Sequence, residues 1–217
     1  MVTFPAQQSS GNNTQDFWSL GGNTGTTPGT NRLGTNDNQP FELWVNGSRA
    51  FRIEPQTDNF IAFGPAPNVI GGSSFNAVTN GAVGATIAGG GSANANKVSG
   101  NFGSVGGGAL NTASGNDATV GGGIKNTASG NDAVVTGGAT NNASGNDSTV
   151  AGGEQSTASG LASTVSGGTI NTASGADSAV AGGGVNNASG NYSFRDGHAK
   201  SWLPVSDSDK SNSTNSA

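Results

Sequence analysis

The chain has 217 residues, of which 39 are glycine, 31% are hydrophobic and only 10% are charged. This composition is too rich in glycine for an ordinary mixed domain and too poor in charge for an expanded disordered chain, so something regular must replace the usual core. A formal net charge of -5, with the eight Lys and Arg residues scattered, excludes a surface that binds nucleic acid by charge. The absence of cysteine excludes a disulfide framework and a thiolate metal site.

Residues 1–16 are expected to form a flexible N-terminal arm. The opening stretch, MVTFPAQQSSGNN, has neither the positive segment nor the apolar segment of a secretion signal. No stretch reaches the roughly 20 apolar residues that a membrane helix requires. We therefore expect a soluble chain that carries no export signal and does not insert into a membrane.

Residues 17–67 are predicted to form a separate β module, because most aromatic residues of the N-terminal part fall there, including Trp18 and Trp44. Within it, the stretch PFELWVNGSRAFRIEP alternates apolar and polar residues on both sides of Asn46-Gly47, which indicates a β-hairpin.

The register of this hairpin depends on its turn. A three-residue turn over 46–48 would place Phe41 opposite Ile53, Leu43 opposite Phe51 and Glu42 opposite Arg52. A two-residue turn is expected to scramble those faces.

Residues 68–191 repeat with a period of 15. The tripeptide ASG occurs at 113–115, 128–130, 143–145, 158–160, 173–175 and 188–190. Valine recurs at Val105, Val120, Val135, Val150, Val165 and Val180. Upstream, Val69-Ile70-Gly71-Gly72 and Ile87-Ala88-Gly89-Gly90 show the same phrase 18 residues apart. Such a short period is typical of one coil of a β-solenoid, and about eight coils begin near Val69.

One coil is expected to contain two short strands, one within 117–121 and one within 125–129, joined by bends at Gly122-Gly123 and at Gly130. Alternation places Ala118 and Val120 on the inside of the first strand. It places Asn126 and Ala128 on the inside of the second, with Thr127 and Ser129 outside.

Burial of one valine and a few small residues per coil stabilises the fold little compared with the entropic cost of ordering the coil. We therefore expect several chains to pack side by side, most simply as a homotrimer. The bulkier residues Leu110, Ile170 and Val185 are expected to face such neighbours. Residues 192–205, with Tyr192, Phe194 and Trp202, are predicted to cap the last coil, and residues 206–217 to form a disordered tail.

The phrase V-x-G-G-x-x-N-x-A-S-G, over residues 69–191, resembles the head repeats of YadA-like trimeric adhesins. The stretches FWSLGGNTGTTPGTNRLGTNDNQPFELWVNGSRAFRIEP and NYSFRDGHAKSW are similar to segments that flank such repeats in phage tail-fibre-like proteins. The resemblance implies an all-β, left-handed parallel β-roll that forms a homotrimer, preceded by a small β-hairpin module.

Asp117, Asp132, Asp147 and Asp177 recur beside the turns, which suggests calcium-binding solenoid repeats. Those repeats have a period of nine residues, and Leu161-Ala162 interrupts the row here. We expect ordinary Asx-type turns and no metal.

A second row could form a flat polar surface. It consists of Thr112-Ser114, Thr127-Ser129, Asn142-Ser144, Thr157-Ser159, Thr172-Ser174 and Asn187-Ser189. It is similar to the Thr-x-Thr arrays of insect antifreeze solenoids, so an ice-binding solenoid is an alternative function. Ser replaces the second Thr throughout and Asn interrupts the first, which favours strand faces that simply meet water.

The sequence shows no arrangement of catalytic residues. His198 is the single histidine, there is no G-x-S-x-G motif, and no lysine follows a glycine as in a phosphate-binding loop. A glycosidase would need two opposed carboxylates. Glu42, Glu54 and Glu154 are far apart in the chain, and the turn aspartates repeat identically, which fits turn geometry better than an active site. We expect no enzymatic activity, no cofactor and no catalytic residue, and the receptor-binding residues are unknown at this stage.

Together these features predict a structural trimeric fibre protein, most simply a phage tail fibre in the virion that attaches to a host glycan or protein. The module at 17–67 is expected to bind the phage baseplate or other tail proteins. The alternative is the head domain of a bacterial trimeric autotransporter adhesin at the bacterial cell surface, for which an export signal and a membrane anchor would be expected.

Overall fold

The computed structural model describes residues 22, 24–27, 30, 32–55 and 66–190, together with the backbone of residues 193 and 194. The chain divides into two compact units, Met1–Asp37 and Asn38–Ala217, and all strands lie in the second. The predicted arm at 1–16, the tail at 206–217 and the cap at 192–205, apart from its two-residue strand, lie outside the described residues.

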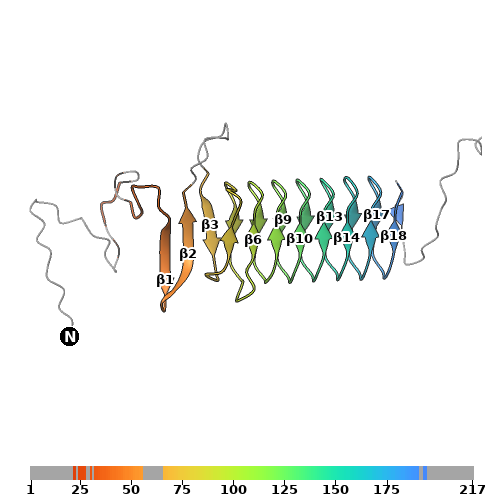
Figure 1. Cartoon of the computed structure of the whole chain (residues 1–217), viewed down its shortest axis with the longest axis horizontal. Helices are drawn as coiled ribbons and strands as arrows, with labels where there is room; N and C mark the ends of the chain where they lie inside the picture. Colours follow the sequence, from red (N-terminus) through yellow and green to blue (C-terminus); the bar gives the residue numbers. More distant parts are fainter. Residues whose placement is uncertain are drawn as a thin grey trace, which may run out of the picture. The chain divides into compact units, whose positions relative to one another are not determined.

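The strands of the second unit form two sheets. In Figure 1 the strands of each sheet follow one another along one direction. Sheet A has 11 strands, ordered along the chain as β1 (Phe41–Val45), β2 (Ser48–Glu54), β3 (Asn68–Gly71), β5 (Thr86–Ile87), β7 (Ser104–Val105), β9 (Thr119–Val120), β11 (Val134–Val135), β13 (Thr149–Val150), β15 (Thr164–Val165), β17 (Ala179–Val180) and β19 (Ser193–Phe194). Sheet B has 8 strands, namely β4 (Ala77–Val78), β6 (Lys97–Val98), β8 (Thr112–Ala113), β10 (Thr127–Ala128), β12 (Asn142–Ala143), β14 (Thr157–Ala158), β16 (Thr172–Ala173) and β18 (Asn187–Ala188).

The repeats form a parallel β-solenoid, as the 15-residue period predicted. Each coil contributes one strand to each sheet, and the 8 strands of sheet B correspond to eight coils. Neighbouring coils pair in parallel, for example Val120 with Val135 in sheet A and Ala128 with Ala143 in sheet B.

A third ladder, which the sequence analysis did not predict, runs between the two sheets. It consists of single parallel bridges between equivalent residues of successive coils, such as Ile124 with Ala139. A coil therefore has three sides, formed by sheet A, sheet B and this third ladder.

The interior follows the predicted alternation. Ala118, Val120, Asn126 and Ala128 are all completely buried. Their equivalents in other coils form continuous columns, of which the valine column beginning at Ile70 and Ile87 is the largest. A single chain thus encloses its own thin core, so any association between chains has to use the outward faces.

Two glycines in each coil are required because the coils stack backbone against backbone. A Cβ on Gly130 would overlap the carbonyl oxygen of Gly145 in the next coil. A Cβ on Gly123, which also has a φ of +85°, would overlap the carbonyl oxygen of Gly138. By contrast, a Cβ on Gly122 would meet nothing within 4 Å, so only the second glycine of the pair is needed for stacking.

The first coil differs from the alignment expected from the phrase V-x-G-G. Ile70, and not Val69, pairs with Ile87 and enters the core column. The reason is Asn68, which must lie inside because its side chain donates to Ala82 O at 2.9 Å and accepts from Ala85 N at 2.8 Å. Alternation then turns Val69 outward.

The hairpin register is as predicted, but the prediction about its turn was wrong. Phe41 pairs with Ile53, Glu42 with Arg52 and Leu43 with Phe51. The turn nevertheless has two residues, Asn46 and Gly47, both with positive φ as a tight hairpin turn requires. An irregularity in the register between Leu43 and Trp44 adds one residue to β2 and restores the faces.

The hairpin continues the solenoid. β2 pairs antiparallel with β3, so sheet A runs without interruption from the hairpin into the coils. Because Arg52 pairs with Ile70, Arg52 lies on the inner side of the sheet, and Phe51 and Ile53 lie on the outer side.

Candidate functional surfaces

A ladder of buried asparagines links the coils. We call it the inner asparagine ladder, and it comprises Asn76, Asn96, Asn111, Asn126, Asn141, Asn171 and Asn186, with Ser156 at the equivalent position of one coil. Each side-chain oxygen accepts from the backbone N–H of the next coil, as Asn111 does from Asn126 at 3.0 Å. The amide of Asn126 donates to Gly122 O and Gly138 O, both at 2.9 Å. The buried amides are therefore satisfied and fix the register of stacking.

Ser156 is the weak position of this ladder. Its hydroxyl is 3.4 Å from both Asn171 N and Glu154 O, which is at the limit of a hydrogen bond. No amide is available there to bond Gly152 and Gly168. This coil is consequently held less tightly than its neighbours.

A second asparagine ladder, exposed at the bend between sheet B and sheet A, had not been predicted. The backbone N–H of Asn101 donates to Asn116 Oδ1, that of Asn116 to Asn131 Oδ1 and that of Asn131 to Asn146 Oδ1, at 3.1, 3.1 and 3.0 Å. The Asn that follows A-S-G at positions 116, 131 and 146 was the signal for it. The ladder ends where Leu161 replaces asparagine.

The row of turn aspartates follows from backbone conformation. Asp117, Asp132, Asp147 and Asp177 have φ between 55 and 57°, and Ala162 at the interrupting position has φ 53°. Aspartate tolerates this left-handed region better than most residues, which explains its recurrence without a bound ion. Within the described ranges, no group of three or more His, Cys, Asp or Glu side chains could hold a metal ion.

The predicted Thr-Ser row lies on the outer face of sheet B. Thr112, Thr127, Asn142, Thr157 and Thr172 are paired in parallel register, so their side chains form a straight row. These residues are half-buried by their neighbours, and the serines two positions later are exposed. The row is polar, as its residue types require.

The predicted neighbour-facing residues Leu110, Ile170 and Val185 lie beside the third ladder, each with φ between 56 and 60°. They are exposed in the single chain, as is Ile124 on the ladder itself. Lys125 and Glu154 occupy equivalent places in other coils of this side. This third side is therefore a mixture of apolar and charged residues.

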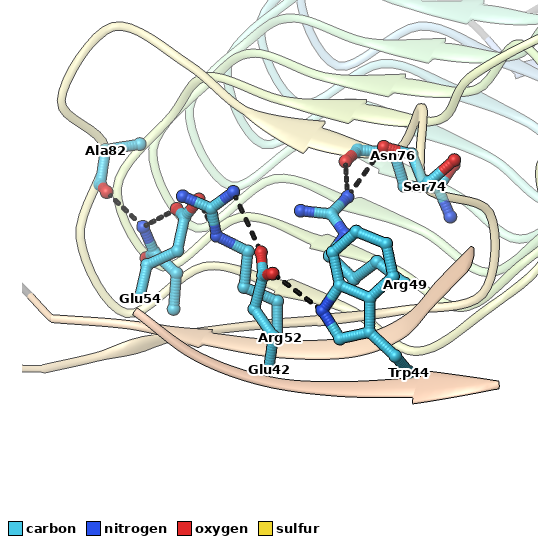
Figure 2. A network of polar contacts seen from close by, with 9 residues as sticks. Glu42, Trp44, Arg49, Arg52, Glu54, Ser74, Asn76 and Ala82 are labelled. Carbon is cyan, nitrogen blue, oxygen red and sulfur yellow. Dashed lines mark hydrogen bonds and ion pairs between the residues drawn. The ribbon is translucent and has the colours of Figure 1, made fainter. Parts of the chain in front are cut away.

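The N-terminal end of the solenoid is closed by polar side chains of the hairpin (Figure 2). Arg52 lies between two carboxylates, with Nη1 3.4 Å from Glu42 Oε1 and Nε 3.0 Å from Glu54 Oε1. The Nε–H does not point at Glu54, so that contact is an ion pair without a hydrogen bond. Trp44 Nε1 donates to Glu42 Oε2 at 2.9 Å, and Glu54 Oε2 is 3.4 Å from the buried Asn68 amide.

Arg49 takes the place of a missing coil. In the solenoid, the carbonyl of each inner-ladder asparagine accepts from the coil before it, as Asn96 O does from Ala77 N. Asn76 belongs to the first coil, so no such donor precedes it. Its carbonyl instead accepts from Arg49 Nη2 at 2.9 Å, and the same nitrogen donates to Ser74 O at 2.8 Å (Figure 2). Arg49 thereby protects the open edge of sheet B.

The candidate acids are not assembled into one site by the described structure. Glu42 and Glu54, far apart in the sequence, come together around Arg52 at the N-terminal end, whereas Glu154 lies on the third ladder of a distant coil. Both hairpin carboxylates are engaged by Arg52, Trp44 and Asn68. His198 lies outside the described residues.

The outer face of sheet A had not been singled out from the sequence. Its outward positions from Val69 to Ala181 hold only Val, Thr, Ser, Ala and Gly, and on the hairpin it continues as Phe41, Leu43, Val45, Phe51 and Ile53. This face therefore carries no charged residue in any described coil.

Comparison of the chain with protein-family models and with curated proteins produced no match. The residues that the structure describes include no helix that is long and apolar enough to cross a membrane.

Proposed function

We propose that this chain is the structural subunit of a left-handed, homotrimeric fibre that attaches to a cell surface, most simply a phage tail fibre. The observation that carries the proposal is the uninterrupted stack of eight coils, in register in both sheets and, from Ala109 to Gly184, in the third ladder as well. At the usual strand spacing, this stack makes a rod of roughly 35 to 40 Å.

Stiffness is supported by the way the coils meet. Each coil contributes backbone hydrogen bonds on both sheets, and the inner asparagine ladder adds a side-chain bond at every junction, with only the one from Asn171 N to Ser156 at the distance limit. Because a Cβ on the stacking glycines would overlap the backbone of the next coil, successive coils lie close together and there is little room for bending or sliding. A rod of this kind suits a mechanical role.

The trimer is supported by the surfaces of the single chain. The core holds little more than one valine and two alanines per coil, so stability gained from neighbours would be a large addition. Long flat outer faces are available for such contacts. Threefold display would also multiply weak contacts with a receptor through avidity.

Antibody labelling distinguishes a fibre on a phage particle from an adhesin on a bacterial cell. Antibodies against the purified chain would be applied to phage particles and to intact cells from the organism that encodes it. Gold-labelled antibody at the phage tail supports the proposal, and label confined to the cell surface supports the bacterial adhesin alternative. Label on neither surface contradicts an attachment role.

A second candidate, ice binding, is favoured by one observation: the straight Thr-Ser row on sheet B. The test is the thermal hysteresis of the purified chain and of a Thr127→Lys variant. Hysteresis that the variant lacks would support ice binding, whereas wild-type protein without hysteresis contradicts it.

A further inference from the structure

We propose that the outer face of sheet A is the surface through which copies of this chain associate, with this face toward the symmetry axis. The proposal rests on the trimeric fibre above and names the surface that builds it. The first observation behind it is that the hairpin and the coils place their apolar residues on opposite sides of sheet A.

In the coils, the inner side of sheet A is the more apolar one, and the outer side mixes Thr and Ser with Val, Ala and Gly. The hairpin reverses this order. Glu42, Arg52 and Glu54 lie on the inner side, where they close the end of the core. The outer side carries Phe41, Leu43, Val45, Phe51 and Ile53, of which Leu43 and Val45 are 48% and 67% exposed. An apolar sheet face that no described residue covers is expected to be buried against another layer.

The same face remains free of charge along the whole solenoid, and it differs in this from the other two sides. Sheet B carries Lys97 on its outer face, and the third side carries Lys125 and Glu154. Depletion of charge is the compositional mark of the centre of an interface. Side chains no larger than valine in the coils also let another backbone approach closely.

The extent of the face indicates its occupant. It spans the hairpin and eight coils, so a partner that covers all of it must be straight and must repeat at the spacing of the coils. A second copy of this chain, lying parallel, has the same spacing because it is built of the same coils. Three copies arranged around an axis would close the assembly and leave the Thr-Ser row of sheet B outward.

One coil offers three threonines on its three sides for a matched test. Thr164 lies on sheet A, Thr169 on the third ladder and Thr172 on sheet B. The chain has no cysteine, so T164C, T169C and T172C each introduce a single thiol. After sedimentation of each full-length variant, the thiols are oxidised and covalent dimers are measured on denaturing gels.

We expect T164C to form covalent dimers at least ten times faster than the other two variants, because equivalent residues meet at the axis. Faster crosslinking of T169C or T172C, or a trimer in which none crosslinks, overturns the proposal for this face but leaves the fibre standing. A wild-type chain that sediments as a monomer contradicts the proposed fibre itself.

The hairpin part of the face has its own test. Leu43→Asp should weaken association at least ten-fold, measured as the concentration at which the trimer dissociates. Leu161→Asp, at a more exposed position on the bend between sheet B and sheet A, should leave that concentration unchanged. If Leu43→Asp only destabilises the fold without altering association, another part of the same chain covers the patch, and the proposal is wrong.

Discussion

The backbone N–H of Asn126 donates a hydrogen bond to the side-chain oxygen of Asn111, and Asn126 in turn accepts the equivalent bond from Asn141, both at 3.0 Å. Each buried asparagine thus binds its own coil to both neighbours. In a solenoid built of small side chains, these polar contacts carry much of the specificity that a larger apolar core would supply. The repeated asparagine is therefore a structural residue.

The inner asparagine ladder can be tested with two adjacent residues. Asn141→Ala removes donors to Gly137 O and Gly153 O and the acceptor for Ser156 N, all of them buried or half-buried groups. We expect the free energy of unfolding to fall by about 3 kcal/mol. Asn142→Ala removes the outward residue next to it, whose buried Oδ1 accepts no hydrogen bond, and should leave the free energy unchanged or raise it. Equal losses in denaturant titrations at one protein concentration would refute the structural role of the ladder.

The weak coil can be strengthened. Ser156→Asn would restore an amide that can donate to Gly152 O and Gly168 O, as Asn171 donates to Gly167 O and Gly183 O at 2.8 and 2.9 Å. The expected gain is about 1 kcal/mol in the free energy of unfolding. Thermal unfolding of the variant and the wild type measures it, and a lower melting temperature would contradict the expected fit of asparagine at this position.

The paired glycines predict opposite results for neighbouring substitutions. Gly138→Ala places a Cβ against Gly153 O at a residue with φ +88°, and we expect a loss of at least about 2 kcal/mol. A Cβ at Gly137 meets nothing within 4 Å, so Gly137→Ala should leave stability unchanged or raise it by about 0.5 kcal/mol. Chemical denaturation of both variants is the measurement. Tolerance of alanine at Gly138 would mean that the coils stack less closely than described.

The arginine that closes sheet B is expected to act locally. Arg49→Ala leaves Ser74 O and Asn76 O without their donor and should cost about 2 kcal/mol at the first coil. Hydrogen exchange should accelerate at the Ala77 and Thr79 amides and stay unchanged beyond Val120, because contacts in a solenoid are between neighbours. Lys125→Ala on the third side serves as the control. Uniform acceleration along all coils would show that Arg49 does not act as a local cap.

The repeat itself made most of the solenoid predictable. A constant 15-residue offset places Val120 beside Val135, and alternation then assigns Ala118, Asn126 and Ala128 to the interior. These inferences need only local geometry and stacking. The recurrence of Asp117 at a turn was likewise readable, since its backbone has a positive φ.

Features that depend on irregular or distant contacts were not predictable. The extra residue in β2 restores a register that the two-residue turn would otherwise have shifted, and no local pattern announces it. Ile70 replaces Val69 in the core because Asn68 bonds to Ala82 and Ala85, which are 14 and 17 residues away in sequence. Arg49 reaches carbonyls 25 and 27 residues further on. The third ladder consists of single-residue bridges, which are too short to produce an alternating pattern of apolar and polar residues in the sequence.

Sedimentation equilibrium of the purified chain tests the central claim most directly. A trimeric fibre predicts a single species of three times the 21.0 kDa mass of one chain, stable on dilution. A well-folded species of 21.0 kDa at all concentrations would contradict it.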